Sequence, residues 1–426
     1  MSHLQSPISP PIPHLRRQGA ATQLIVDGRP FIMLAGEIHN SSSSNLAYME
    51  QVWDKLAALH CNTALVPVSW ELIEPEEGRY DFGLVDGLIE AARRRNLRLV
   101  PLWFGTWKNA TATYVPGWVK TNLARFPRAQ AIAGRNGNHL SALGTESCAA
   151  DARAFAALMR HIRQIDGEDH TVIMVQVENE TGILGAPRDH CSLAEAAFAA
   201  PVPAELTRYL QAHSEALVPE LRAAWDAAAT HSGAWAQVFG NVADEAFMAW
   251  HIGRYVDEVT AAGQAEYALP MYANAWLVQH EFQAPGQYPS GGPVSRMLNV
   301  WQCAAPHINL CAPDIYLPDF AGICKSYTQA GNALFIPEAH HDETAGAHGF
   351  YAVGQYDALG FSPFGIESMN AAETEVYTEA NRLLADMMPL LCAAQGTGNM
   401  VGVLQGDELG GEVILGGYTL RIKFSQ

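Results

Sequence analysis

The sequence predicts a (β/α)₈ barrel, the TIM-barrel fold, with long insertions in its βα loops. Short segments rich in apolar and β-branched residues alternate with amphipathic, alanine-rich segments along most of the 426-residue chain, and this alternation is typical of strands joined by helices. The strand segments are apolar on both faces, which is the pattern of buried parallel strands. Eight such units follow one another, the number that closes a barrel of this kind.

The expected strands can be placed by residue number. They lie at residues 31–36, 62–68, 97–103, 171–177, 268–274, 308–314, 333–337 and 360–365, and a last helix is expected at residues 371–391. The alternative fold is an open, doubly wound sheet. A glycine-rich phosphate loop would open a helix in such a fold, and the sequence contains no such motif. The barrel is therefore the preferred prediction.

Some segments depart from the regular alternation. Residues 1–23 carry prolines where a secretory signal would have its apolar core, and we expect a flexible N-terminal arm there, followed by the barrel at residues 24–395. The connection after the fourth strand is far longer than an ordinary loop. It predicts a helical insertion around residues 184–241, forming a small lid beside the pocket. Residues 396–426 change to strand-and-turn character and predict a β-rich C-terminal extension.

Composition and charge exclude several classes of partner. The chain has 44 acidic and 26 basic residues, a formal charge of −18, and so lacks the basic footprint of a nucleic-acid-binding protein. No segment approaches the roughly 18 consecutive apolar residues of a membrane span. The seven cysteines are scattered without metal-type pairing, which favours reduced thiols and a cytoplasmic location. The quaternary state stays open, with a homo-oligomer as one option.

Polar and aromatic residues collect at the carboxyl ends of the expected strands, where a barrel carries its active site. They include Glu37, Trp107, Asn179, Glu180, Asn274, Trp276, Tyr316 and Glu338. Aromatic rings pack against the C–H surfaces of sugars, and acids and amides hydrogen-bond sugar hydroxyl groups. The rim therefore predicts a carbohydrate site. In this prediction Glu37 and Asn274 bind hydroxyl groups, while Trp107 and Trp276 offer stacking surfaces, Trp107 being the preferred one.

Two glutamates are placed to act as a pair. Glu180 follows the fourth strand and Glu338 the seventh, and the ends of these two strands face each other across a barrel. Hydrolysis of a glycosidic bond uses two carboxyl groups, about 5–5.5 Å apart in retaining enzymes and about 6.5–9.5 Å apart in inverting ones. Glu178 is expected to point away from the pocket because adjacent strand residues alternate faces, and to pair with a basic neighbour.

The segment that contains the first glutamate resembles a known signature. VQVENETG at residues 175–182 is similar to the QVENEYG motif of glycoside hydrolase family 35, the retaining β-galactosidases. AGEIH at residues 35–39 and the block WDKLAALHCNTALVPVSWELIEPEEGRYDF at residues 53–82 resemble further motifs of that family. The likeness covers about residues 24–395 and is greatest to the branch whose barrel precedes a small C-terminal domain of uncharacterised role.

The resemblance implies roles for individual residues. Glu180 would be the acid/base and Asn179 the residue that binds the 2-hydroxyl group. Glu338, in LFIPEAHH, would be the nucleophile of a double displacement. Tyr316 is placed to hydrogen-bond the nucleophile and to keep it ionised. The predicted function is hydrolysis of terminal β-D-galactosyl residues, without a cofactor or metal.

The sequence departs from the family pattern at positions that bind the galactosyl hydroxyl groups. These are Asn40, Ser42, Pro67, Glu71 and Ile73, together with Gly105-Thr106-Trp107, which lacks the acid of the corresponding family element. The resemblance therefore supports the roles of the catalytic residues better than it supports the identity of the sugar. Another exo-β-glycosidase is the alternative function.

Two rival functions belong to other classes. His340, His341 and Asp342 suggest a metal-dependent hydrolase, to which His39 and His307 could contribute. Such a site needs several ligands that converge from different strands, and it would give the glutamate pair no role. The second rival is a carbohydrate-binding barrel without catalysis, which the presence of both glutamates disfavours.

Overall fold

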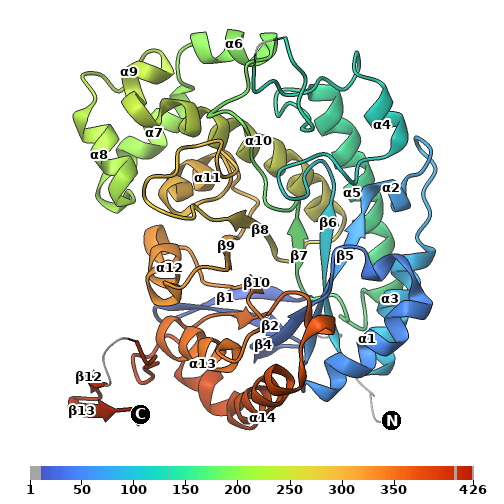
Figure 1. The fold of residues 1–426 in the computed structure, drawn as a ribbon, viewed down its shortest axis with the longest axis vertical. Coiled ribbons are helices and arrows are strands. Elements are labelled where there is room, and N and C mark those ends of the chain that lie inside the picture. The colour runs from blue at the N-terminus through green and yellow to red at the C-terminus, as the bar shows by residue number, and fades with distance from the viewer. Residues whose placement is uncertain (1–10, 133, 407–409, 425–426) are drawn as a thin grey trace, which may run out of the picture.

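The protein is a barrel of eight parallel strands, seen here in a computed structural model that describes residues 11–132, 134–406 and 410–424 (Figure 1). The strands are β4 (Met33–Glu37), β5 (Thr63–Ser69), β6 (Arg98–Phe104), β7 (Val175–Val177), β8 (Met271–Trp276), β9 (Leu310–Ile315), β10 (Glu338–Ala339) and β11 (Gly360–Phe361). Their order in the sheet is β10-β9-β8-β7-β6-β5-β4-β11, and all neighbours are parallel.

The remaining gap, between the seventh and eighth strand segments, is closed by single backbone contacts. Ile336 forms a parallel bridge with Phe361, and the Ser362 N–H donates to the Ile336 carbonyl at 3.0 Å. The Phe364 N–H donates to the Ala339 carbonyl at 3.0 Å on the same seam. The (β/α)₈ prediction is therefore confirmed.

The last two strands are shorter than predicted, and proline explains part of the difference. The segment 333–337 was expected as a strand, whereas the ladder begins only at Glu338. Pro337 has no N–H to give to a ladder. The segment 360–365 pairs regularly only at Gly360 and Phe361, because Pro363 interrupts it in the same way.

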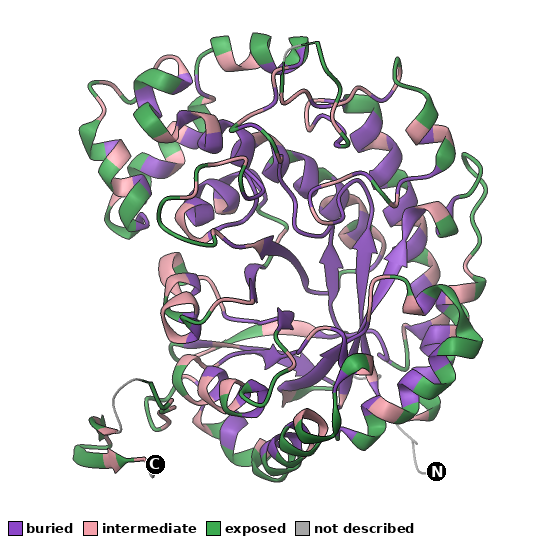
Figure 2. Ribbon diagram, in the orientation of Figure 1, coloured by how far each residue is buried: buried purple, intermediate pink, exposed green. Residues whose placement is uncertain are grey.

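Helices surround the strands on the outside of the barrel (Figures 1 and 2). The longer ones are α1 (Leu46–Ala58), α3 (Gly83–Arg94), α5 (Thr145–Asp166), α10 (Ala243–Glu266), α12 (Phe320–Tyr327), α13 (Ala345–Tyr356) and α14 (Ala371–Ala394), and α11 (Leu298–Ala304) is shorter. Their inner faces are buried and their outer faces exposed, as expected of amphipathic helices on a barrel. Short helices α2 (Trp70–Ile73) and α4 (Gly117–Thr121) lie in the loops at the carboxyl end.

The N-terminal residues close the opposite end of the barrel. Strands β1 (His14–Gln18), β2 (Ala21–Val26) and β3 (Arg29–Phe31) form an antiparallel sheet. Leu24 and Val26 of β2 are buried in one cluster with the barrel-interior residues Met33, Val100 and Leu310. The expected flexible arm at residues 1–23 is thus wrong for residues 14–23, and its residues 1–10 lie outside the described part of the chain.

The two irregular segments have the predicted kind of secondary structure. The insertion at 184–241 contains α6 (Ser192–Ala199), α7 (Ala204–Ala212), α8 (Pro219–Ala227) and α9 (Trp235–Phe239), at the upper left of Figure 1. The C-terminal extension forms an antiparallel hairpin of β12 (Gly410–Leu415) and β13 (Tyr418–Lys423) with largely exposed side chains.

All seven cysteines are buried and none is paired in a disulfide. Within the described ranges, no helix combines the length and the apolar character that crossing a bilayer would need.

Candidate active site

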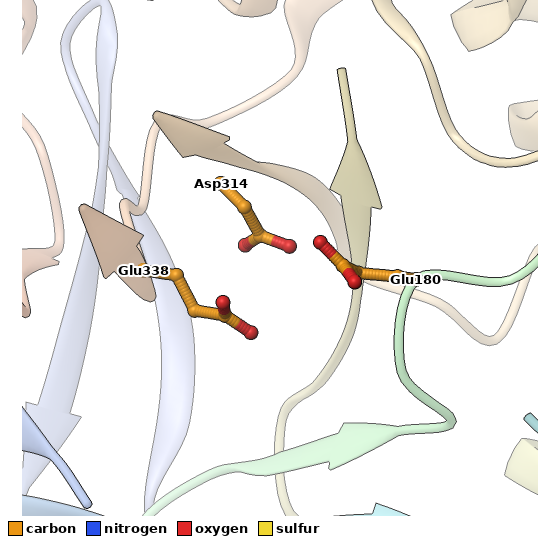
Figure 3. A group of neighbouring side chains, drawn as sticks. All are labelled: Glu180, Asp314 and Glu338. Atoms are coloured by element: carbon orange, nitrogen blue, oxygen red, sulfur yellow. The ribbon is translucent and has the colours of Figure 1, made fainter. Parts of the chain in front are cut away.

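Three buried carboxyl groups converge at the carboxyl end of the barrel (Figure 3). Glu180 follows β7, Asp314 belongs to β9, and Glu338 begins β10. One oxygen from each lies within 4.8 Å of the other two. The predicted meeting of Glu180 and Glu338 across the barrel mouth is therefore present in the structure, and Asp314 lies beside both.

Glu338 is held by hydrogen-bond donors at both of its oxygens. The Asn179 and Asn274 side-chain amides donate to Oε1 at 3.2 and 3.3 Å. The Tyr316 hydroxyl donates to Oε2 at 2.8 Å. A carboxylate that only accepts hydrogen bonds is favoured in its ionised form. This is the state that a nucleophile needs.

Glu180 has the surroundings of a proton donor. Burial, and next the negative charge of Glu338, raise its pKa to about 7. Lys108, the Asn109 side chain and Asp314 oppose this rise. Asn109 Nδ2 donates to Glu180 Oε2, and the Glu180 N–H donates to Asn274 Oδ1 at 2.9 Å. A carboxyl group with a pKa near neutrality can both give and take a proton at the pH of a cell.

Asp314 is a site residue that the sequence interpretation passed over in favour of Tyr316. Burial raises its pKa well above the usual range, and the charges of Glu338 and Glu180 raise it further. It accepts from Asn274 Nδ2 at 2.7 Å, and one of its oxygens lies within 4.8 Å of a Glu180 oxygen. Its position at the end of a fully apolar strand was the available signal, because a carboxyl group has no use in such a strand unless it reaches a site.

The loop after β6 brings a cation and an amide to the same place. Lys108 Nζ donates to Asn179 Oδ1 at 2.9 Å and lies 5.0 Å from the centre of the Phe104 ring. Asn109 adds a backbone N–H to the same Asn179 oxygen at 3.2 Å. Lys108 is buried, so its charge acts on the carboxyl groups with little screening. No feature of the sequence assigned either residue a role in the site.

The pocket above these groups has a volume of about 340 Å³. Its lining consists of Asn40, Lys108, Asn109, Glu180, Trp276, Leu277, Gln279, Asp314, Tyr316, Glu338 and Phe364. Trp276 thus lies where a stacking surface was predicted. The described lining includes no residue from the 184–241 insertion, so the expected lid does not form part of this pocket.

Four predicted substrate-binding residues lie outside the lining: Asn179, Asn274, Trp107 and Glu37. The two asparagines are buried and contact Glu338 instead. The Trp107 side chain is 1% exposed and packs edge-on against Tyr255, with ring centres 4.8 Å apart. The prediction that Trp107 stacks on a sugar is therefore wrong, because the ring is enclosed by protein. Glu37 is completely buried, and its carboxyl oxygens make no hydrogen bond within the described residues. Burial raises the pKa of Glu37 well above its usual range, followed by the charge of Glu338.

Glu178 points away from the pocket as predicted, but its partner is an acid. Its carboxyl group is hydrogen-bonded to Asp151 of α5. The prediction of a basic partner is wrong.

The histidines of the rival metal hypothesis point to other partners. His340 hydrogen-bonds the Tyr316 carbonyl at 3.1 Å, and His341 contacts Glu373 at 3.1 Å. His39 contacts Ser368, and His307 contacts Asp257. Among the described residues, the group whose spacing could hold a cation is the carboxyl trio itself.

Comparisons with known proteins give the family context of this site. Residues 42–240 match the β-galactosidase family Glyco_hydro_42. A β-galactosidase from Xanthomonas manihotis is 28% identical over 183 residues, which cover 41% of this chain and 27% of that protein. Over these residues the chain is similar to β-galactosidases. The family matched in this comparison is family 42, whereas the sequence motifs resembled those of family 35.

Solved structures show the same fold at low sequence identity. The β-galactosidase from Rahnella sp. R3 has a TM-score of 0.56 and 16% identity over 84% of this chain and 57% of its own. The β-galactosidase from Bacillus circulans sp. alkalophilus has a TM-score of 0.57 and 13% identity, covering 84% and 56%. The catalytic domain of a Paenibacillus polymyxa β-amylase has a TM-score of 0.56 and 11% identity, covering 83% and 97%. The chain spans little more than half of these two β-galactosidases and about a quarter of the Xanthomonas protein.

Proposed function

We propose that this protein is a retaining β-glycosidase, with terminal β-D-galactosyl residues as its preferred substrates. The observation that supports this proposal most directly is the pair Glu180 and Glu338, two neighbouring carboxyl groups in different surroundings. Hydrogen-bond donors surround both Glu338 oxygens, while burial and the Glu338 charge raise the pKa of Glu180 to about 7. A carboxylate held by hydrogen-bond donors can serve as the nucleophile, and a neighbouring carboxyl group with a raised pKa can serve as the acid.

The spacing of the two groups favours retention of configuration. Their closest oxygens lie within 4.8 Å, near the separation of about 5–5.5 Å in retaining enzymes and below the 6.5–9.5 Å that leaves room for a water in inverting ones. A sugar placed between them would meet the Glu338 carboxylate on one face and the Glu180 proton at its leaving oxygen.

The reaction then proceeds in two displacements. Glu338 attacks the anomeric carbon while Glu180 gives its proton to the departing oxygen. Once Glu338 is esterified its negative charge is gone, so one cause of the raised pKa of Glu180 disappears. The pKa falls, and Glu180 can now take a proton from the water that attacks the ester.

The neighbouring residues prepare these steps. Asn179 lies between Lys108 and Glu338, and we assign the remaining hydrogen of its amide to a hydroxyl group next to the reacting carbon. Tyr316 keeps a Glu338 oxygen in a fixed direction. Trp276 on the pocket wall offers an aromatic face to the sugar or to the leaving group. A pocket of about 340 Å³ accommodates a small ligand such as a sugar unit.

A panel of chromogenic aryl β-glycosides tests the proposal. We expect cleavage of the β-galactoside at the highest kcat/KM, and loss of cleavage in Glu338→Gln. Glu343→Gln is the matched control, since Glu343 is an exposed acid in the loop that follows β10. Exclusive cleavage of a β-glucoside or β-xyloside would reject the galactose assignment and keep the mechanism. Cleavage of no glycoside by the folded protein would reject the proposed function.

The stereochemistry tests retention separately. Proton NMR of the anomeric signal should show the β-anomer of the free sugar first, followed by slow mutarotation. If the α-anomer forms first, the two-displacement mechanism is wrong.

A further inference from the structure

A second pair of carboxyl groups lies behind the wall of the pocket. Asp151 is on α5 and Glu178 ends the β7 segment, two residues before the acid/base. Both are fully buried and in hydrogen-bonding contact with each other. A buried pair of acids has a large desolvation cost unless the pair shares a proton and its other lone pairs are satisfied.

The contacts of Asp151 are all of the accepting kind. Trp103 Nε1 donates to Oδ1 at 2.8 Å, and the Thr106 N–H donates to Oδ2 at 3.0 Å. The Tyr255 hydroxyl reaches Oδ2 at 3.4 Å. Indole and backbone N–H groups only donate, so both Asp151 oxygens act as acceptors, which favours the ionised form of Asp151.

Glu178 has one accepting oxygen and one that faces only Asp151. The Trp107 N–H donates to Oε2 at 2.7 Å. Oε1 makes no other hydrogen bond within the described residues. A methyl group at Gly105 would lie 2.7 Å from both Glu178 Oε1 and Asp151 Oδ1, so the two oxygens meet around this glycine. The proton therefore belongs on Glu178 Oε1, from which it is donated to Asp151.

The pair accepts hydrogen bonds from the backbone of the loop that carries Lys108 and Asn109. It binds two consecutive N–H groups, those of Thr106 and Trp107. The next two residues in the chain contact Asn179 and Glu180. The loop and the strand end are also joined directly, because the Asn179 N–H donates to the Trp107 carbonyl at 3.2 Å.

The backbone at this junction is strained and needs such support. Glu178 and Glu180 have φ values of 63° and 46°, and Asn109 and Ala110 in the loop have values of 48° and 55°. The left-handed region costs a non-glycine residue roughly 1–2 kcal/mol. Four such residues persist at one junction only when surrounding contacts hold them there.

We propose that Asp151 and Glu178 share one proton, with Glu178 neutral, and that this pair is a positioning device that delivers Lys108 and Asn109 to the acid/base Glu180. The pair touches neither the pocket nor a substrate. It acts through the loop, and its catalytic consequence rests on the function proposed above for Glu180. The glutamate that precedes Asn179 in the ENE motif thus has a task of its own.

The charged and titratable neighbours are consistent with one negative charge on the pair. Burial raises the pKa of Glu178 well above its usual range, and the Asp151 charge raises it further. Cys148, one turn earlier on α5, and Tyr255 on α10 also face the pair, and burial keeps the pKa of both high, so they stay neutral. At Glu180 itself the facing groups are Glu338 and Asp314, which are acids, and the cation Lys108.

Two isosteric substitutions separate the two acids. Glu178→Gln keeps an oxygen for the Trp107 N–H and a donor for Asp151, so it should leave kcat and the titration of Glu180 near their wild-type values. In Asp151→Asn the side-chain NH₂ group would face another donor, either the Trp103 indole N–H or the Thr106 N–H, and one hydrogen bond would be lost. The loop should shift, and a displacement of about 1 Å lowers kcat by about 10²-fold.

The titration of Glu180 distinguishes a positioning role from a purely structural one, because a pair that only stabilised the fold would not change the pKa of Glu180. Infrared difference spectra of each protein against its Glu180→Gln version report this titration without substrate. Because Lys108 and Asn109 both lower the pKa of Glu180, Asp151→Asn should move it above the wild-type value. Asp166→Asn is the matched control, since Asp166 is a buried acid at the far end of α5 that binds the Val172 N–H at 2.7 Å.

The outcomes are distinct. An upward shift in Asp151→Asn alone, together with loss of one protonated-carboxyl band near neutral pH in Glu178→Gln, supports the proposal. An equal shift in Glu178→Gln, no lost band, or no shift in Asp151→Asn overturns it. If Asp151→Asn does not fold, Glu178→Met, which cannot bind the Trp107 N–H, should give the upward shift. A wild-type protein that cleaves no glycoside would refute the proposed function while the infrared spectra still decide this proposal.

Discussion

Replacing Glu180 with glutamine should make the protein more stable at high pH while it removes the catalytic acid. In the folded protein, burial and the Glu338 charge raise the pKa of Glu180 from 4.5 to about 7. Each pKa unit corresponds to about 1.36 kcal/mol, so the shift represents about 3 kcal/mol of coupling between ionisation and unfolding. Glutamine resembles the protonated acid in shape and does not titrate.

The direction of the pH effect follows from which state holds the proton more tightly. The folded state does, so the contribution of protonated Glu180 is fully present below about pH 4.5 and is lost as the pH rises through about 7. Above pH 7 the wild-type protein must keep a buried carboxylate and the glutamine variant does not. The difference in unfolding free energy, variant minus wild type, should therefore rise by about 3 kcal/mol between pH 4.5 and pH 8.

Urea unfolding of both proteins at closely spaced pH values measures this difference. Glu343→Gln serves as the control, because an exposed carboxyl group should give a difference that hardly changes with pH. Activity on a substrate with a poor leaving group should fall by about 10²–10⁴-fold in Glu180→Gln. A stability difference that is flat across this range, or that falls as the pH rises, would refute the assignment of a raised pKa to Glu180.

Three other changes test separate parts of the structure. Tyr316→Phe removes a 2.8 Å hydrogen bond to the Glu338 carboxylate, and kcat/KM should drop by about 10- to 100-fold; an unchanged value would mean that this bond does not prepare the nucleophile. Trp276→Ala should raise KM by roughly 2- to 10-fold with a smaller effect on kcat, because an aromatic contact is worth about 0.5–1.5 kcal/mol; steady-state kinetics on an aryl glycoside decide this. Leu24→Ala should cost about 2–5 kcal/mol of unfolding free energy, whereas Ile414→Ala on the exposed hairpin should cost less than about 0.5 kcal/mol, and equal losses would contradict the buried role of β2.

The barrel was predictable because each strand is a continuous apolar run, and such runs are visible without any knowledge of tertiary contacts. The N-terminal residues were wrongly predicted to be a flexible arm, although the sequence contains a signal for the strands found there. Asp27 and Gly28 join β2 to β3, and both have positive φ values, 50° and 77°. Asp-Gly between two strand-like segments is a strong hairpin signal. The prolines that precede it are typical of a flexible segment and favoured the wrong prediction.

The site was predictable only where the residue type and its place at a strand end already indicated chemistry. Glu180 and Glu338 meet that condition. The burial of Trp107 depends on Tyr255, which is 148 positions further along the chain, and the partner of Glu178 lies on a helix that precedes its strand. Lys108 enters the pocket because the loop turns back toward Asn179. These contacts join residues that are far apart in the sequence, so no local sequence pattern predicts them.

Identification of the covalent intermediate tests the central claim most directly. An activated 2-deoxy-2-fluoro-β-galactoside forms the glycosyl ester but releases it slowly, so the protein can be digested and the labelled peptide sequenced by mass spectrometry. We expect one label, on Glu338. A label on Asp314 or Glu37 would contradict this assignment. So would a protein that cleaves the parent galactoside but forms no covalent adduct with the fluorinated sugar and is not inactivated by it.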